Sequence, residues 1–455
     1  MAAAKDTREG SLEAPTRHAL AWRDADFTDE AKLDAELRRV FDICHGCRRC
    51  FNLCDSFPRL FDLCDNSPSG ELHDVKSEDF KGVVDACTLC DMCYLTKCPY
   101  VPPHEFNLDF PHLMLRTRAV ELKKGQVPGA RRQLTETDRN GALGTLFAPV
   151  ANWASDAANA PARALMEQTL GVDRRAALPR FAGKTLVLQA LETPKAVNPD
   201  APAYGRKAVL YATCFCNYNT PEIGLAARAV LAKNGVETEI LHPACCGMPQ
   251  LEHGDIAKVA ARAKKVAAEL LPWVDKGYDI VALVPSCALM LKSEWPLILP
   301  EDRDVKRLAR ASRDISQYVM EIAKGPGLAP GLLSLPGGVA LHLACHARAQ
   351  NIGAKAAEML RLIPGAKVQV IERCSGHGGS WGVAKENFEI GVRVGRPVAR
   401  TAANALKDGQ AAFVASECPL AGDHIRQGIE LLGETPPETS FHPIQIFARA
   451  YGVLP

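Results

Sequence analysis

The chain has 455 residues, 47% hydrophobic and 24% charged, which argues against a disordered or membrane-embedded protein and predicts a soluble one with several domains. Its 54 Lys and Arg residues nearly balance 53 Asp and Glu residues, giving a formal net charge of +1. We therefore expect no nucleic-acid partner, because such binding depends on a basic surface.

The N-terminal segment has neither the apolar core of a secretory signal peptide nor a twin-arginine pair. No later stretch supplies the roughly 20 uninterrupted apolar residues that span a bilayer. We expect a cytoplasmic protein, with attachment to the inner face of the cell membrane as the alternative. The first predicted element is a helix from Asp29 to Phe41, with Leu33, Leu37 and Val40 on one face.

Cysteines divide the rest of the sequence. Of the 17, nine lie between Cys44 and Cys98, and eight lie between Cys214 and Cys418. In a reducing compartment so many thiols are not expected to form disulfides, and their clustering indicates metal ligands.

The N-terminal cysteines form two runs with the spacing of iron-sulfur ligands. A loop with a thiolate at every third residue can bind three corners of a cubane, and in two-cluster ferredoxins the last Cys of each run binds the other cluster. The runs are Cys44-x2-Cys47-x2-Cys50-x3-Cys54 and Cys87-x2-Cys90-x2-Cys93-x4-Cys98-Pro99. Two [4Fe-4S] clusters are therefore predicted. Their ligand sets are Cys44, Cys47, Cys50 and Cys98 for one, and Cys87, Cys90, Cys93 and Cys54 for the other.

Zinc is the alternative at both runs, since tetrahedral sites of four thiolates also use Cys-x2-Cys pairs. Zinc does not explain a third Cys at the same interval. Two departures from the ferredoxin pattern concern loop geometry: Asp55 follows Cys54 where Pro is usual, and four residues instead of three precede Cys98. Cys64 lies outside both runs and is predicted to be a buried apolar residue.

Residues 116–204 contain no cysteine and form a predicted connector rich in Ala, Arg and Pro. A basic stretch that includes Arg116, Arg118, Arg131 and Arg132 precedes an apolar one. The apolar residues are Leu143, Leu146, Phe147, Val150 and Trp153. The commoner arrangement is a charged helix face beside a buried segment, and the alternative is a segment that docks on an anionic membrane surface or on a partner.

From about residue 205 the pattern alternates between strand and helix, and it does so twice. This order predicts α/β modules with parallel strands. In the first half, strands are predicted at 208–213, 236–241 and 279–284, with helices from Thr220-Pro221 to Asn234 and from Asp255 to Leu270. In the second half, strands are predicted at 339–344, 366–371 and 411–416, with helices around 354–362 and 384–406.

The cysteines support a duplication. Cys214 and Cys345, Cys245 and Cys374, and Cys287 and Cys418 are separated by 131, 129 and 131 residues, and each follows a predicted strand. Open parallel sheets bind ligands beyond the carboxyl ends of their strands, so the repeat predicts one site in each half.

The motifs around these cysteines resemble a known family. They are ATCFCNYN, CCGMPQ, PSCALM, LACHARAQNIG, CSGHGGSWG and ECPLA, and with the double ferredoxin motif they cover most of residues 40–455. The chain resembles the CCG-domain iron-sulfur oxidoreductases, which include the iron-sulfur subunits of glycolate oxidase and of anaerobic glycerol-3-phosphate dehydrogenase, and the heterodisulfide reductase catalytic subunit. In that family a complete CCG module binds a noncubane [4Fe-4S] cluster with one Cys, a Cys-Cys pair and a closing Cys-x2-Cys.

Both modules depart from the complete pattern. In the first, Met290 replaces the closing Cys; the remaining candidates are Cys214, Cys245, Cys246 and Cys287, with Cys216 as a fifth. In the second, Ser375 and Ala421 replace cysteines; the remaining candidates are Cys345, Cys374 and Cys418. The resemblance implies an iron-sulfur cluster in the first module. In the second it leaves open a cluster with an open corner or zinc with a histidine, from His346, His377 or His424, although a lone His is more often structural.

The expected fold is a helical, ferredoxin-like two-cluster domain at 1–115, the connector at 116–204, and two duplicated α/β CCG modules at 205–325 and 326–455. The resemblance implies an iron-sulfur subunit that relays electrons from a flavoprotein dehydrogenase, for a 2-hydroxy acid or glycerol 3-phosphate, towards the quinone pool. No G-x-G-x-x-G fingerprint follows a strand, so we expect no flavin or nicotinamide on this chain.

Two other functions are the alternatives. The first is a heterodisulfide or thiol-disulfide reductase acting at the first CCG site, which the missing cysteines weaken. The second is a structural or regulatory metal protein. No catalytic residue is predicted.

Overall fold

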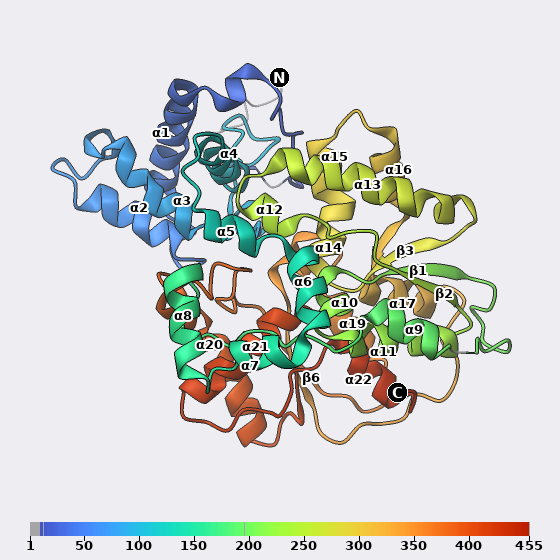
Figure 1. Cartoon of the computed structure of the whole chain (residues 1–455). Helices are drawn as coiled ribbons and strands as arrows, with labels where there is room; N and C mark the ends of the chain where they lie inside the picture. Colours follow the sequence, from blue (N-terminus) through green and yellow to red (C-terminus); the bar gives the residue numbers. More distant parts are fainter. Residues whose placement is uncertain (1–9, 12, 195, 455) are drawn as a thin grey trace, which may run out of the picture. The chain divides into compact units, whose positions relative to one another are not determined.

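The computed structural model describes residues 10, 11, 13–194 and 196–454 (Figure 1), so the sequence features of residues 1–9 fall outside it. The chain forms two compact units. The first contains Met1–Pro128, Gln250–Ala257 and Leu297–Pro300, and the second contains Gly129–Pro249, Lys258–Pro296 and Glu301–Pro455. The domain boundaries at residues 115, 204 and 325 stay predictions.

The first unit consists of helices and short helical turns, with no strand among its described residues. Its likeness to a two-cluster ferredoxin stays a prediction. Its elements along the N-terminal part of the chain are η2 (Ala25–Thr28), α1 (Glu30–Cys47), α2 (Ser56–Asp65), η3 (Leu72–Asp74), η4 (Ser77–Phe80), α3 (Lys81–Ala86), η5 (Cys93–Lys97) and α4 (Phe110–Lys123).

Helix α1 confirms the predicted N-terminal helix and extends it into the first cysteine run. It begins after Asp29, whose side chain accepts a hydrogen bond from the Lys32 N–H at 2.9 Å. It ends at Cys47, where Arg48 takes the left-handed conformation with φ 54°. The residues buried on its apolar face are Leu33, Leu37, Val40 and Phe41.

Aromatic packing joins the helices of the first unit. The Phe41 ring meets the Phe80 ring edge-on with 5.0 Å between centroids, and the Phe57 ring lies 4.7 Å from that of Phe110. All four side chains are buried and come from α1, η4, α2 and α4. Cys64 is buried too, as predicted.

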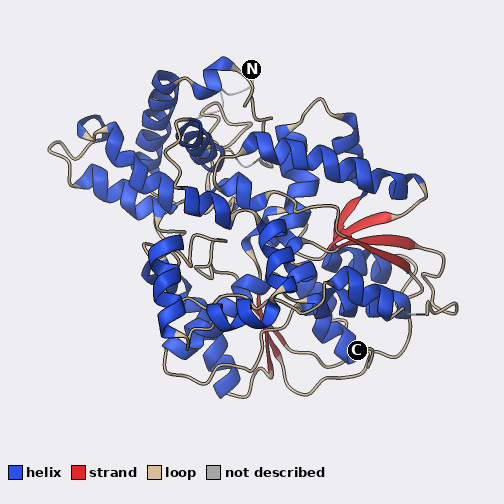
Figure 2. Cartoon of the chain, viewed as in Figure 1, coloured by secondary structure: helices blue, strands red, loops and turns tan. Residues whose placement is uncertain are grey.

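Two parallel sheets form the core of the second unit and confirm the predicted α/β modules (Figure 2). Their strand orders are β2-β1-β3-β4 and β6-β5-β7, so the first strand of each module is central. The strands are β1 (Lys207–Tyr211), β2 (Glu237–Leu241), β3 (Asp279–Ala282), β4 (Ser312–Asp314), β5 (Val339–His342), β6 (Val368–Ile371) and β7 (Phe413–Ser416). Strand β4 was not predicted, because its sequence Ser-Arg-Asp carries no apolar run.

The predicted helices between the strands are present. Helix α11 begins at Pro221 after Thr220 and ends before Asn234 and Gly235, and Gly235 has the positive φ that favours glycine, 83°. The helices that follow β1 in the chain are α10 (Cys214–Tyr218), α11 (Pro221–Lys233), α12 (Met248–Glu252), α13 (Ile256–Asp275), α14 (Pro285–Leu289), η6 (Met290–Glu294), α15 (Trp295–Ile298), α16 (Arg303–Ala311), α17 (Ile315–Lys324), α18 (Cys345–Ala349), α19 (Lys355–Leu360), α20 (Phe388–Lys407), α21 (Pro419–Leu431) and α22 (Pro443–Ala450).

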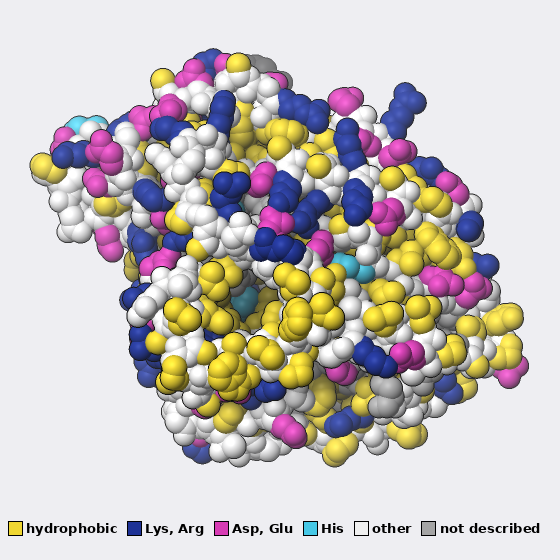
Figure 3. Space-filling view, in the orientation of Figure 1, with side chains coloured by type: hydrophobic (Ala, Val, Ile, Leu, Met, Phe, Trp, Pro, Cys, Tyr) yellow, Lys and Arg dark blue, Asp and Glu magenta, His cyan; other side chains and the backbone are white. Residues whose placement is uncertain are grey.

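The connector is helical, and the expectation that its apolar run is buried is wrong. Its helices are α5 (Gly129–Leu134), α6 (Thr137–Leu146), α7 (Ala148–Ser155), α8 (Ala160–Leu170) and α9 (Leu186–Glu192). The exposed apolar side chains, called the α6–α7 patch below, are Leu143, Leu146, Phe147, Val150 and Trp153, with exposed fractions of 52% to 71%. Figure 3 shows hydrophobic side chains gathered over α6 and α7.

Glycines explain why these side chains face outward. A Cβ on Gly141 would lie 2.2 Å from the Tyr218 ring, and one on Gly144 would lie 2.4 Å from the Phe181 ring. The inner face of α6 therefore has room for glycine only, and the larger apolar residues of the helix project from its other side.

No helix among the described residues is long and apolar enough to cross a bilayer.

Close backbone contact also fixes the loop that follows β6 and carries Cys374. Gly376 has φ 79°, and a Cβ there would lie 1.9 Å from the carbonyl oxygen of Gly391 in α20. One turn further along α20, a Cβ on Gly395 would lie 2.1 Å from the carbonyl oxygen of Ser375. The loop thus packs on the helix backbone without intervening side chains.

We expect Gly395→Ala to lower the midpoint of thermal unfolding. In an open helix the change would stabilise the protein by about 1 kcal/mol, because Ala has the higher helix propensity. The clash with the Ser375 carbonyl should reverse that sign. The control is Gly82→Ala in α3, whose Cβ would meet only the flexible Arg59 side chain at 3.8 Å. Calorimetry that found no drop for Gly395→Ala relative to Gly82→Ala would contradict the close contact.

Candidate metal centres

Four thiols from the two N-terminal runs gather at the end of α1. Cys44 and Cys47 lie three residues apart on its last turn and so share a face. Burial and then the neighbouring Cys98, Cys50 and Cys47 raise the pKa of the Cys44 thiol well above its usual value. Burial, Cys98 and Cys47 likewise raise the pKa of Cys50 to about 12. The structure thus brings together the first predicted ligand set.

The second predicted set gathers beside it. Burial and then Cys90 and Cys87 raise the pKa of the Cys54 thiol well above its usual value. The pKa of Cys93 is also raised, by burial and then by Cys90, Cys87, Cys50 and Cys54. The last cysteine of each run therefore lies with the other run, and the influence of Cys50 on Cys93 places the two sets next to each other.

Backbone N–H groups point at the last thiol of each run. Burial raises the pKa of Cys98 to about 11, and the N–H groups of Tyr100 and Val101 oppose that rise. The N–H groups of Ser56 and Phe57, at the start of α2, oppose the rise at Cys54 in the same way. In both runs the donors lie two and three residues after the cysteine. Such donors stabilise a thiolate and, in iron-sulfur proteins, help to set the reduction potential.

Arg17 holds the loop of the second run. Its guanidinium pairs with Asp91 at 2.8 Å and with Asp109 at 2.8 Å, and it lies over the Tyr94 ring. Asp91 stands between Cys90 and Cys93 in the left-handed conformation, φ 62°. Although burial raises the pKa of Asp109, His112 and Arg17 hold it well below its usual range. The N-terminal segment therefore braces the second run electrostatically.

In the first CCG module the predicted cysteines lie beyond the carboxyl ends of the strands. Cys214 follows β1, Cys245 and Cys246 follow β2, and Cys287 follows β3 on α14. The Cys214 thiol is within hydrogen-bonding reach of Cys245, Cys245 of Cys246, and Cys246 of Cys287. The expected convergence of these four residues is present.

Buried aromatic side chains hold the Cys-Cys turn. The Tyr211 hydroxyl donates to the Ala244 carbonyl at 2.5 Å, and the Trp295 indole N–H donates to the Cys246 carbonyl at 3.0 Å. Gly247 has φ 88°, and its N–H donates to the Cys245 sulfur at 3.5 Å. Burial and the four surrounding thiols raise the pKa of Tyr211 well above its usual value.

Two further candidates differ in their surroundings. Cys216 is buried, and its pKa is raised to about 12 by burial, with a hydrogen bond to Thr213 opposing the rise and Cys287 contributing to it. Met290, at the position of the missing family cysteine, is fully buried in η6.

A residue that the sequence pattern missed is Asp138 of the connector, whose carboxylate accepts the Cys245 N–H at 2.7 Å. No cysteine or repeat marks that segment of the sequence.

The thiols of the second α/β module influence one another less than those of the first. Cys345 begins α18, Cys374 follows β6, and Cys418 precedes α21. Cys374 is exposed, its sulfur accepts a hydrogen bond from the Gly376 N–H at 3.4 Å, and no other thiol affects its pKa. Burial raises the pKa of Cys418 to about 11, and Cys287 of the first module adds to the rise. The two modules thus present Cys287 and Cys418 to each other.

The three histidines of the second module differ in role. His346 Nδ1 lies 2.8 Å from the Ser286 hydroxyl of the first module. The rings of His377 and His424 pack edge-on at 5.9 Å, and burial, with His424 adding to it, lowers the pKa of His377 to about 3. A neutral imidazole of this kind is competent to bind a metal.

The cysteine chemistry fits a polynuclear cofactor. Among the described residues, no group of three or more His, Cys, Asp or Glu side chains is arranged to hold a single metal ion. Buried thiols that raise one another's pKa cannot all ionise unless a cation compensates the charge, and bound iron would supply that charge.

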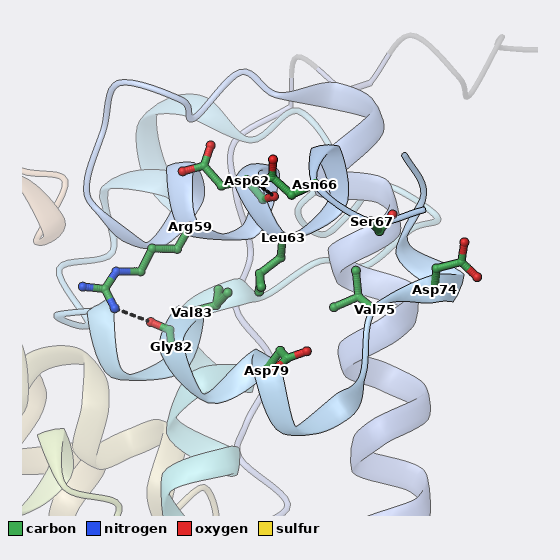
Figure 4. A pocket seen from close by; sticks show the side chains of 10 residues that line it. All are labelled: Arg59, Asp62, Leu63, Asn66, Ser67, Asp74, Val75, Asp79, Gly82 and Val83. Atoms are coloured by element: carbon green, nitrogen blue, oxygen red, sulfur yellow. Dashed lines mark hydrogen bonds between the residues drawn. The ribbon is translucent and has the colours of Figure 1, made fainter. Parts of the chain in front are cut away.

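An open cavity of about 510 Å³ in the first unit is lined by Arg59, Asp62 and Asp79 among others and by no cysteine (Figure 4), so it is not part of these centres.

We expect Arg17→Met to weaken the second N-terminal centre. Removing the guanidinium leaves the buried Asp91 without this ion pair and leaves Asp109 with His112, at a cost of about 3 kcal/mol. Thermal unfolding should begin earlier, and iron should be lost faster to a chelator. Arg23→Met, at an exposed residue of the same segment, is the control. Equal rates of iron loss in the two variants would refute a bracing role for Arg17.

Comparisons with known proteins match the region that contains the first CCG site. The family model described as CCG, cysteine-rich domain, matches residues 208–292, which cover the first module. A subunit of the anaerobic glycerol-3-phosphate dehydrogenase of Escherichia coli (strain K12) is 28% identical over 322 residues, 70% of this chain and 76% of that protein. A subunit of the fumarate reductase (CoM/CoB) of Methanothermobacter marburgensis is 26% identical over 237 residues, 50% of this chain and 43% of that protein.

A third relative is lactate utilization protein A of Bacillus cereus (strain B4264), 26% identical over 187 residues, 39% of this chain and 74% of that protein. These matches confirm the resemblance that the cysteine motifs indicated. Residues 208–292 are therefore similar to the CCG cysteine-rich domain, and the chain is similar to the three relatives over 39% to 70% of its length.

Proposed function

We propose that the chain is an iron-sulfur electron-transfer subunit of a dehydrogenase or reductase. The observation that carries this proposal is the interlocked arrangement of the eight N-terminal thiols, in which Cys98 lies with Cys44, Cys47 and Cys50, and Cys54 lies with Cys87, Cys90 and Cys93. The residues that would hold two [4Fe-4S] clusters are these eight. When bound, each cluster supplies a one-electron carrier.

The closeness of the two thiol sets supports a relay. Cys50 of one set influences Cys93 of the other, so the two centres would be neighbours within one unit. Hydrogen bonds from backbone N–H groups to Cys54 and Cys98 favour the thiolate form at both. In the second unit, Cys214, Cys245, Cys246 and Cys287 would hold a further iron-sulfur cluster, and Cys345, Cys374 and Cys418 are the candidates for another.

The names of the relatives support the partner class. Two of them are named as subunits of a dehydrogenase or a reductase, and one as a lactate utilization protein. Glycerol 3-phosphate and lactate, a 2-hydroxy acid, are the substrate types that we propose for a separate flavoprotein partner. This chain would accept the electrons and pass them towards quinone.

We expect Cys98→Ser and Cys54→Ser to affect different centres. Cys98→Ser should disturb the centre of Cys44, Cys47 and Cys50, although Cys98 belongs to the other run of the sequence. Cys54→Ser should disturb the centre of Cys87, Cys90 and Cys93. Iron and sulfide analysis with paramagnetic resonance would show one altered signal and one intact signal in each variant.

The matched control is Cys64→Ser, because Cys64 is buried and lies outside both sets. Retention of both signals in Cys98→Ser would contradict the interlocked ligation, and zinc in place of iron and sulfide in the purified protein would refute the proposal. Turnover of disulfides without a flavoprotein would favour a local reductase instead of a relay.

The α6–α7 patch supports a contact with the membrane surface. Monomeric soluble proteins rarely expose a contiguous patch of large apolar side chains without a partner. Trp153 and Phe147 are the aromatic types favoured at a membrane interface. Arg139 precedes Leu143 by one turn on α6, so a cation borders the apolar side chains and complements anionic lipid. We propose the anionic membrane surface as the occupant of the patch.

We expect the double variant Leu146→Ser, Trp153→Ser to bind vesicles at least tenfold more weakly, since burial of each side chain contributes about 2 kcal/mol. Cosedimentation with phosphatidylcholine vesicles, with and without phosphatidylglycerol, measures this. Leu191→Ser is the control, because Leu191 is 75% exposed on α9 outside the patch. Absence of vesicle binding by the unaltered protein would refute the membrane contact and favour a protein partner.

A further inference from the structure

The start of α6, which belongs to the connector in sequence, forms one wall of the first CCG site. One Asp138 carboxylate oxygen accepts the Cys245 N–H at 2.7 Å, and the other lies 2.9 Å from His242 Nε2. Arg262 in α13 pairs with the same carboxylate at 3.3 Å. The segment is therefore fixed against the Cys-Cys turn from two sides.

Glu136 strengthens the attachment. Its carboxylate pairs with Lys258 and, at 3.5 Å, with Arg262, and both bases lie on α13. Charged groups on either side of Thr137 thus hold its backbone in place. The position of the Thr137 side chain is consequently set by the fold and not by a flexible loop.

The Thr137 hydroxyl is an unpaired polar group next to the thiols. Its oxygen is buried and has no hydrogen-bond partner. Its neighbour Asp138 accepts the Cys245 N–H at 2.7 Å, which places Thr137 beside the Cys-Cys turn. The hydrogen bond to Cys245 and burial raise the pKa of Cys214 well above its usual value, and the nearby Thr137 hydroxyl opposes that rise. Burying a hydroxyl without a partner costs about 1 to 3 kcal/mol. We therefore expect the hydroxyl to gain a hydrogen-bond partner when the site holds its metal cofactor.

The first module also lacks one ligand of the complete family pattern. Met290 occupies that position, is fully buried and offers no hydrogen-bond donor. The polar group that the fold directs at the thiols instead comes from the connector. Thr137 was therefore not among the residues that the cysteine repeat predicted.

We propose that the Thr137 hydroxyl donates a hydrogen bond to a metal-bound thiolate of the first CCG centre and thereby raises the reduction potential of that centre; this inference rests on the proposed function. Thr137 is a positioning and tuning residue, not a ligand. The reduced centre carries one more negative charge than the oxidised centre, so a donor stabilises it more strongly.

The test is a redox titration of the whole protein, followed by paramagnetic resonance. Thr137→Val keeps the size of the side chain and removes the donor, whereas Thr137→Ser keeps the donor. We expect Thr137→Val to shift the oxidised-to-reduced ratio of the first CCG centre at least tenfold at a fixed potential, which equals a lowering of about 59 mV for one electron. Thr137→Ser should stay near the unaltered protein.

The matched control is Thr145→Val, the same change eight residues along α6, where the hydroxyl reaches the Tyr218 carbonyl at 3.5 Å. An unchanged potential in Thr137→Val would overturn the inference, and so would equal shifts in Thr137→Val and Thr137→Ser. Thr137→Ala gives the same comparison if the valine variant does not fold.

Failure of the inference is distinguishable from failure of the proposed function. Iron, sulfide and a resonance signal for the first CCG centre in the unaltered protein establish that the centre exists. Their absence would overturn the first CCG centre and the inference together. Their presence with no effect of Thr137→Val would overturn the inference alone.

Discussion

The structure depends on the crowding of buried thiols, which burial and then neighbouring thiols make difficult to ionise. Raising the pKa of Cys50 from 9.0 to about 12 means that ionising this thiol in the protein alone costs about 4 kcal/mol more than in water. Iron bound at each set would remove that cost by supplying positive charge. Helix α1 and the turns of the first unit keep the thiols close together, so that ionising several of them needs a compensating cation.

One hydrogen-bonding arrangement recurs at four of the thiols. A backbone N–H two residues further along the chain points at the sulfur of Cys54 and Cys98 in the first unit, and at the sulfur of Cys245 and Cys374 in the second. In the second unit that residue is a glycine with positive φ, because only glycine takes this turn without strain. The protein therefore stabilises thiolate charge with its backbone in two unrelated folds.

The two α/β modules share the order of three strands, β2-β1-β3 and β6-β5-β7, and differ in their sites. In the first, four thiols form a continuous set, and charged residues of the connector hold the Cys-Cys turn. In the second, Ser375 and Ala421 stand where thiols would be, and no thiol acts on Cys374. The proximity of Cys287 and Cys418, and the contact of Ser286 with His346, join the two sites. The first module thus gathers four thiols, whereas the second contributes three thiols that influence one another less.

The sequence by itself determined the parallel α/β modules, helix α1 and the placement of six cysteines after strands, because apolar periodicity and cysteine spacing are local properties of the chain. The gathering of Cys98 with the first run and of Cys54 with the second was also predicted from spacing. Tertiary structure alone decided that α6 turns its glycines inward and its large apolar residues outward, since Tyr218 and Phe181 occupy the space on the inner side. It alone brought Thr137 and Asp138 to the thiols, because contacts between residues more than 70 positions apart depend on packing that no local pattern encodes.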